Sequence, residues 1–213
     1  MPQVAAELTP SDAPTVAGAI VAAYGDLRGH APPARTSWLW PLALSANETD
    51  TWGNGPSPYG GLWNNNVGNV TSPHPTSEAW YDNPHVYKSL GLKFRAFDTL
   101  RAGALAMLED LDAHGAIAAA DAGDAAGWQS ALTDYLHEVE KDPATGQPTG
   151  KLVPYPALDA RIATLAGTSP SGAGDTPAGR LASRGRSPAR VFGLVLGFVG
   201  AVGLAHMARR RVA

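Results

Sequence analysis

Apolar side chains recur every three to four residues in several stretches of the chain, the spacing that gives a helix one apolar face. Asp98 or Thr99 is placed to cap one of these helices, and Gly115 is placed to stop it. The predicted helices cover, in chain order, residues 13–28, 100–111, 128–139 and 156–166.

Residues 53–92 do not share this pattern. They are rich in Gly, Pro and Asn and show no helical period, so they predict loops with room for a short hairpin. Helices around a polar, irregular lobe indicate an α+β domain that is mainly α. We expect this domain to cover residues 1–166.

The C-terminal part of the chain has a different composition. Residues 167–190 are rich in Gly, Ser, Pro, Ala and Arg and predict a flexible linker. Residues 191–208 are apolar apart from His206, and a helix of that length spans about 27 Å, close to the hydrocarbon core of a bilayer. The alternative is a buried amphipathic helix, but this segment is apolar on all sides. It therefore predicts a transmembrane helix.

Two features bear on how the predicted transmembrane segment would lie in a membrane: a pair of glycines and the basic residues after it. Gly193 and Gly197 form a GxxxG pair, a pattern typical of close helix–helix contact in membranes. The basic tail, 209–213, favours a cytoplasmic C-terminus with the domain facing outward, although arginines also flank the other end of the segment. No signal peptide is expected, because Glu7 and Asp12 precede the first apolar run.

Charge and composition exclude several functions. The domain carries nine Lys and Arg against eighteen Asp and Glu, which argues against nucleic-acid binding. The chain has no cysteine, so thiolate metal sites and disulfides are excluded. His137 and Glu138 lack the second histidine of a zinc-protease helix. We therefore expect neither a metal site nor a cofactor.

Glu48 is the residue with the clearest chemical potential. It follows the apolar run WLWPLALSAN, in which Pro41 must either lie in the first turn of a helix or kink it. Glu48 then lies near the C-terminal end of a largely buried helix, where both the helix dipole and the low dielectric disfavour a negative charge. Such a carboxyl keeps its proton near neutral pH, as a general acid must. The alternative is a solvated glutamate at a helix end.

Three motifs occur in order along the chain: ETDTWG at 48–53, NNNVGN at 64–69 and FRAFDT at 94–99. Together they resemble the bacterial glucosaminidase and autolysin group of lysozyme-like peptidoglycan hydrolases, over roughly residues 36–165. The resemblance implies a lysozyme-like fold and hydrolysis of the β-1,4 bond of a glycan strand, with Glu48 as proton donor. It also makes Tyr155, in the sequence VPYP, the candidate for the family's cleft tyrosine.

A glycan strand presents hydroxyls, acetamides and apolar ring faces, which bind aromatic platforms and neutral amides. The alternative is that the aromatic residues pack the small lobe and that the asparagines form turns; Gly68 and Asn69 fit such a turn. The candidate platforms are Trp52, Tyr59, Trp63, Trp80 and Tyr81, and the candidate amide donors are Asn64, Asn65, Asn66 and Asn69.

A second catalytic group is left open by the sequence. Glu78 and Asp82 are candidate partners of Glu48, because Asp50 is too close in sequence to face it across a cleft. A carboxylate separation of about 5–5.5 Å gives a retaining enzyme and about 6.5–9.5 Å an inverting one. Assistance by the 2-acetamido group of the substrate needs no second carboxylate.

The sequence therefore predicts a membrane-anchored peptidoglycan hydrolase whose partners are the glycan strand and a lipid bilayer. Glucosaminidase, muramidase and lytic transglycosylase activities remain open. The domain would face the cell wall, or lie in the membrane of a phage virion. The rival hypothesis is a non-catalytic wall-binding or structural virion protein.

Overall fold

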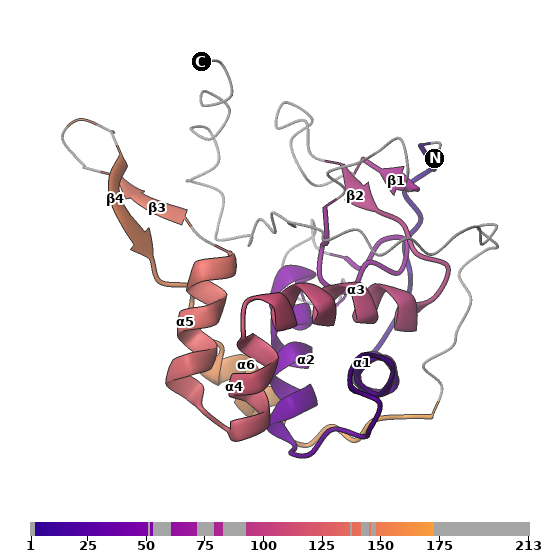
Figure 1. Cartoon of the computed structure of the whole chain (residues 1–213). Helices are drawn as coiled ribbons and strands as arrows, with labels where there is room; N and C mark the ends of the chain where they lie inside the picture. The colour runs from indigo at the N-terminus through magenta and orange to yellow at the C-terminus, as the bar shows by residue number, and fades with distance from the viewer. Residues whose placement is uncertain are drawn as a thin grey trace.

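The computed structural model describes residues 3–50, 52, 61–71, 79–82, 93–136, 138–141, 145 and 148–172. This part is mainly helical, with two short two-stranded sheets (Figure 1). The elements are α1 (Ala13–Arg28), α2 (Thr36–Glu48), β1 (Trp80–Tyr81), β2 (Phe94–Arg95), α3 (Leu100–Ala113), α4 (Ala116–Ala122), α5 (Ala125–Tyr135), β3 (Glu138–Lys141), β4 (Pro148–Val153) and α6 (Asp159–Leu165).

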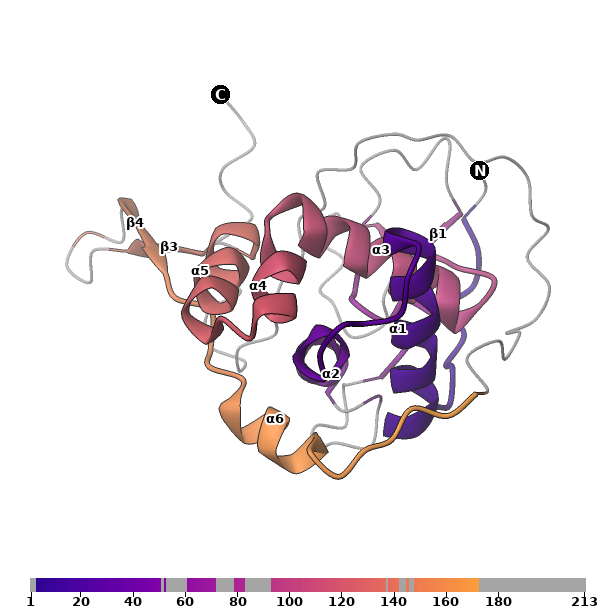
Figure 2. The same cartoon turned by 60° about the horizontal axis from the view of Figure 1, so that its bottom comes forward.

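Helix α2 is the centre of the helical part. Figure 2 shows it end-on, with α1, α3, α4, α5 and α6 around it, and most of its residues are buried. Pro41 lies inside the helix rather than in its first turn, so residue 41 donates no hydrogen bond to the preceding turn. The surrounding elements bury most of α2, including Glu48 at its end.

Two helix predictions are confirmed, and each helix begins directly after a residue whose side chain caps it. Helix α1 has the predicted bounds, and the side chain of Asp12 accepts a hydrogen bond from Thr15 N at its start. Thr99, one of the two predicted caps, accepts from Ala102 N and begins α3. Capping by side-chain oxygens satisfies amides that have no partner inside the helix.

Three parts of the prediction need correction. The expected helix 128–139 ends at Tyr135, and Val139 belongs to β3, which pairs antiparallel with β4. Helix α4 was not predicted, because its sequence AIAAADA gives no distinct apolar stripe. Residues 167–172, assigned to the linker, still contact the domain: Ser171 N donates to Pro14 O at 2.9 Å.

The small lobe consists of four described segments: the N-terminal residues, the 61–71 segment, β1 and β2. The N-terminal residues run beside β1 and the 61–71 segment, with Val4 N donating to Trp80 O at 2.9 Å and Asn64 N to Glu7 O at 2.8 Å. Strand β1 pairs antiparallel with β2, whose Arg95 N reaches Val70 O at 3.0 Å. The lobe therefore lies against the start of α3, above the end of α2 (Figure 1).

The predicted transmembrane segment, 191–208, lies outside the described residues, as do Gly193, Gly197 and the rest of the linker. Among the helices that the structure does describe, none combines the length and the apolar character that crossing a bilayer requires.

Candidate active site

Glu48 is the last residue of α2, and its side chain is 4% exposed. Burial raises the pKa of its carboxyl to about 7, and hydrogen bonding to the side chains of Tyr155 and Asn47 only partly offsets that effect. The C-terminal end of the helix dipole acts in the same direction as burial. Burial and the helix dipole therefore both favour the protonated carboxyl near neutral pH, as the position of Glu48 after an apolar run predicts.

Tyr155 approaches Glu48 from the segment between β4 and α6. Its hydroxyl donates a hydrogen bond to Glu48 Oε1, and it accepts one from Asn47 Nδ2 at 2.7 Å. Burial raises the pKa of the phenol well above its usual value, and the neighbouring Glu48 charge adds to the rise. Tyr155 is therefore a neutral donor that favours the ionised form of Glu48. The structure thus brings the two predicted catalytic residues into contact.

The two carboxyl oxygens of Glu48 have different surroundings. Oε1 accepts the hydrogen bond from Tyr155, whereas Oε2 is buried with no hydrogen-bond partner among the described residues. A carboxylic acid has one proton to place on two oxygens. When Glu48 is protonated, Oε2 is therefore the oxygen that carries the proton.

The backbone around Glu48 is fixed by the asparagine-rich segment. Asn69, in a left-handed conformation with φ 51°, donates its side-chain amide to the carbonyl of Glu48. This bond satisfies a carbonyl at the end of α2, which has no partner within the helix. The expectation that Asn69 shapes the turn agrees with this contact, and the turn also supports the candidate acid.

Asn65 and Asn66 are fully buried. Asn65 Nδ2 donates to Phe97 O at 2.8 Å, and Asn66 Nδ2 donates to Val70 O at 2.8 Å. Asn64 and Asn65 also have positive φ values, of 50° and 56°, which asparagine tolerates better than most residues. These side chains build the turn, so the interpretation of Asn65 and Asn66 as direct substrate donors does not fit their positions.

The predicted aromatic platforms fall into two groups. Trp52 and Tyr81 are buried, and Trp52 Nε1 donates to Ser45 Oγ at 3.0 Å, so both pack the interior. Trp80 is half-buried, but Lys93 Nζ lies 4.1 Å from its ring centroid. That ring face is covered by an ammonium group. Trp63 is also half-buried, and Tyr59 lies outside the described residues.

Asp82, a candidate second carboxylate, lies just after β1 in the small lobe. It forms an ion pair with Lys93 Nζ at 2.9 Å and accepts a hydrogen bond from Gln3 Nε2, also at 2.9 Å. These partners hold the N-terminal segment and β1 together, which gives Asp82 a structural role. Glu78 lies outside the described residues.

Sequence analysis missed a buried acid on α3 that shares Tyr135 as a neighbour with Glu48. Asp110 on α3 is 5% exposed, and its Oδ2 accepts from the hydroxyl of Tyr135 at 3.1 Å. Burial raises the pKa of Tyr135, and the charges of Asp110 and Glu48 add to the rise. An aspartate on the otherwise apolar buried face of α3 was the available signal, but nothing in the sequence links it to residue 48.

Replacing Tyr155 with phenylalanine should raise the pKa of Glu48 above about 7, because the lost hydrogen bond favours the ionised carboxyl. The measurement is a carboxyl ¹³C NMR titration of glutamate-labelled protein, with the Glu48 signal identified by its loss in Glu48→Gln. Tyr24→Phe is the matched control, because Tyr24 OH donates to Asp121 Oδ2 at 2.7 Å. An unchanged or lower pKa in Tyr155→Phe would contradict the assigned contact.

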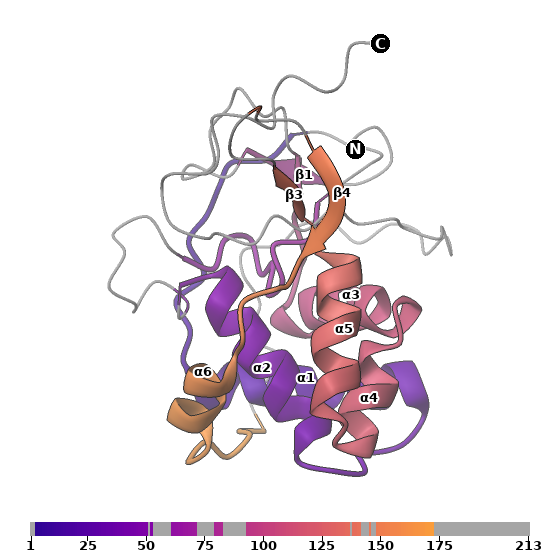
Figure 3. The ribbon, with the colours of Figure 1, turned by 90° about the vertical axis from the view of Figure 1, so that its left-hand side faces the viewer.

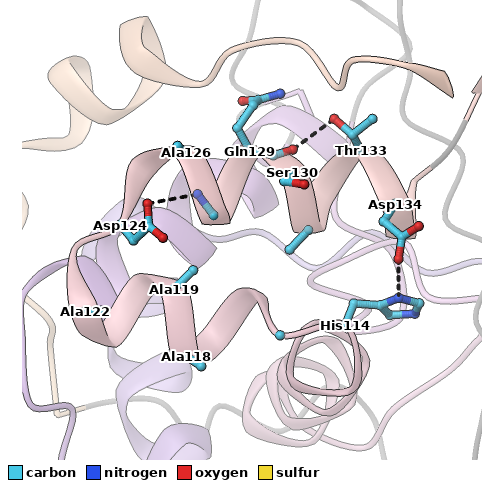
Figure 4. A pocket seen from close by; sticks show the side chains of 13 residues that line it. His114, Ala118, Ala119, Ala122, Asp124, Ala126, Gln129, Ser130, Thr133 and Asp134 are labelled. Atoms are coloured by element: carbon cyan, nitrogen blue, oxygen red, sulfur yellow. Dashed lines mark hydrogen bonds and ion pairs between the residues drawn. The ribbon is translucent and has the colours of Figure 1, made fainter.

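A groove lies between α4 and α5 (Figure 4), and neither Glu48 nor Tyr155 lines it. Small residues such as Ala118, Ala122 and Ala126 form much of its wall, and His114 and Asp134 lie at one end. Two of its lining residues on α5, Gln129 and Thr133, also hydrogen-bond the backbone of Tyr155. This groove therefore does not include the candidate acid. It shares Gln129 and Thr133 with the contacts that hold Tyr155 in place.

Comparison with known proteins gives no family for this chain. No protein-family model, no curated protein and no solved structure matches it.

Proposed function

We propose that this chain is a peptidoglycan hydrolase that cleaves the β-1,4 glycosidic bond with Glu48 as general acid. The observation that supports the proposal is the contact between Glu48 and Tyr155, two residues that are 107 positions apart in the sequence. A buried carboxyl with a pKa of about 7 is half protonated at neutral pH, which is the condition that favours proton transfer. The resemblance of the three sequence motifs to lysozyme-like glucosaminidases supplies the substrate class.

In this mechanism the carboxyl of Glu48 protonates the oxygen that leaves when the glycosidic bond breaks. The resulting carboxylate is stabilised by Tyr155, whose hydroxyl is in turn fixed by Asn47 Nδ2 at 2.7 Å. Stabilisation of the ionised product lowers the barrier for the transfer. The same carboxylate is then placed to accept a proton from water in a hydrolytic step.

The described carboxylates favour a mechanism without a protein nucleophile. Asp82 is engaged by Lys93 and Gln3, and Asp50 lies 3.8 Å from an Arg161 nitrogen. Assistance by the 2-acetamido group of the sugar requires only an acid on the protein side. We also infer that residues 191–208 tether the domain to a lipid bilayer, on the basis of their length and apolar composition.

The test is the clearing of purified sacculi by the full chain, kept in solution with a mild detergent. Glu48→Gln should reduce the rate by about 10²–10⁴-fold, the usual contribution of a general acid. Glu109→Gln, on the exposed side of α3, is the matched control and should clear at the original rate. Mass analysis of the released reducing ends distinguishes glucosaminidase, muramidase and lytic transglycosylase products.

Two outcomes would contradict the proposal. Equal clearing by Glu48→Gln would exclude Glu48 as the acid. Binding of the unaltered chain to sacculi without any clearing would favour the rival function, a non-catalytic wall-binding protein.

A further inference from the structure

The segment that carries Tyr155 has few hydrogen-bonding groups of its own. It runs from Pro154 to Leu158, between the end of β4 and the start of α6, and passes beside α5 (Figure 3). Proline has no backbone N–H, so Tyr155 has the only amide donor within Pro154–Pro156. Both prolines also restrict the backbone around Tyr155. The position of this residue therefore depends on contacts from other elements.

Helix α5 supplies those contacts at both backbone groups of Tyr155. The amide of Tyr155 donates to Thr133 Oγ1 at 2.9 Å, and the carbonyl of Tyr155 accepts from the side-chain amide of Gln129. The Thr133 hydroxyl in turn donates to the carbonyl of Gln129 at 2.9 Å, a bond drawn in Figure 4. The hydroxyl proton of Thr133 is thus used in a hydrogen bond within α5, and the oxygen accepts the hydrogen bond from the Tyr155 amide.

The spacing of the two residues explains how one helix can hold a single residue from both sides. Positions 129 and 133 are four residues apart, so they lie one above the other on α5. The neighbouring buried face of α5 carries Trp128, Leu132 and Tyr135, which anchor the helix in the core. Backbone contacts from a helix fixed in this way leave the hydroxyl of Tyr155 little freedom to move.

We infer that Gln129 and Thr133 are positioning residues, which fix the backbone of Tyr155 so that its hydroxyl reaches Glu48. The inference rests on the proposed function, in which Glu48 is the acid and Tyr155 stabilises its ionised form. Neither residue contacts Glu48 in the described hydrogen-bond network; both act through Tyr155.

The experiment measures the pKa of Glu48 in the full chain with and without these contacts, by carboxyl ¹³C NMR in mild detergent. Thr133→Val preserves the shape of the side chain but removes the hydroxyl. The freed Tyr155 then stabilises the Glu48 carboxylate less, so the pKa of Glu48 should rise, in the same direction as in Tyr155→Phe. Gln129→Ala should act likewise and serves as a second variant should the first fail to fold.

Two controls separate positioning from a general loss of stability. Thr164 on α6 also donates to the carbonyl four residues before it, at 2.8 Å, so Thr164→Val removes a similar helical bond and should leave the pKa of Glu48 unchanged. Thr133→Ser retains the hydroxyl and should restore the original pKa. In a Tyr155→Phe background, Thr133→Val should add no further shift, because the pair acts through the lost hydroxyl.

The outcomes are distinct from those of the activity test. A folded Thr133→Val variant with an unchanged Glu48 pKa would overturn the positioning role, whether or not the chain clears sacculi. A shift that persists in full in the Tyr155→Phe background would also overturn it. If the chain does not clear sacculi but the pKa rises in Thr133→Val as expected, the support of Tyr155 by α5 stands and the hydrolase proposal fails.

Discussion

Glu48→Gln should make the folded chain more resistant to heat than the unaltered protein above pH 7, with the advantage disappearing below pH 4.5. The pKa of Glu48 is raised by burial from 4.5 to about 7, so between these values the folded state binds more protons than the unfolded state. Stability therefore falls as pH rises through this range. At 1.36 kcal/mol per pKa unit the loss is about 3 kcal/mol, and glutamine, which does not ionise, avoids it.

Thermal unfolding of both proteins at a series of pH values measures this effect, because contributions from other titrating groups cancel in the difference. For a chain of this size, about 3 kcal/mol corresponds to a difference in Tm on the order of 6–12 °C above pH 7. Glu109→Gln removes an exposed glutamate and should show no such dependence. A constant difference between Glu48→Gln and the unaltered protein from pH 4.5 to 8 would mean that Glu48 ionises as easily in the fold as outside it.

The burial of this carboxyl was accessible to sequence analysis because the residues next to it indicate it. An apolar run directly before Glu48 indicates a buried helix, and the polar segment after it indicates where that helix ends. The contact with Tyr155 was not accessible in the same way. The two residues are joined by packing between α2 and the segment after β4, and only the family resemblance suggested Tyr155.

The same distinction applies to the rest of the fold. Helices with a clear apolar stripe and a capping residue, such as α1 and α3, were predicted close to their observed bounds. Helix α4 was missed because alanines give little contrast between its faces. Strands β3 and β4 were missed because a short, polar hairpin has no apolar alternation to reveal it. Whether such strands form depends on their pairing with another strand, and the local sequence says little about that pairing.

The asparagine segment shows how one pattern can serve two purposes. Asn65 and Asn66 are neutral amides near a candidate glycosidase acid, which suggested contact with sugar. Their side chains instead bond backbone carbonyls, and Asn65 adopts a left-handed conformation. Turn formation by asparagine is the commoner use of the residue. In this chain it places Asn69 against the carbonyl of Glu48.

Gly103 on α3 allows that turn to pack against the helix, so Gly103→Ala should destabilise the protein. A Cβ atom at this position would lie 1.9 Å from the backbone oxygen of Asn65 and 3.3 Å from Phe97 Cδ2. The backbone of Asn65 cannot retreat easily, because its side chain bonds Phe97 O at 2.8 Å and Phe97 N bonds Asn64 O at 2.9 Å. Overpacking of this kind costs about 1–3 kcal/mol.

Gly25→Ala is the matched control, because Gly25 also lies within a helix but a Cβ atom there would meet nothing within 4 Å. Alanine is favoured over glycine inside helices by about 1 kcal/mol, so this variant should unfold at a higher temperature than the unaltered chain, while Gly103→Ala unfolds at a lower one. If Gly25→Ala raises the unfolding temperature and Gly103→Ala lowers it, the close approach of the turn, and not helix propensity, decides the result at position 103. If Gly103→Ala stabilised the protein, the 61–71 segment would not pack on α3 as the structure has it. The hydrogen bond from Asn69, in the same segment, to the carbonyl of Glu48 at the end of α2 would then also be in question.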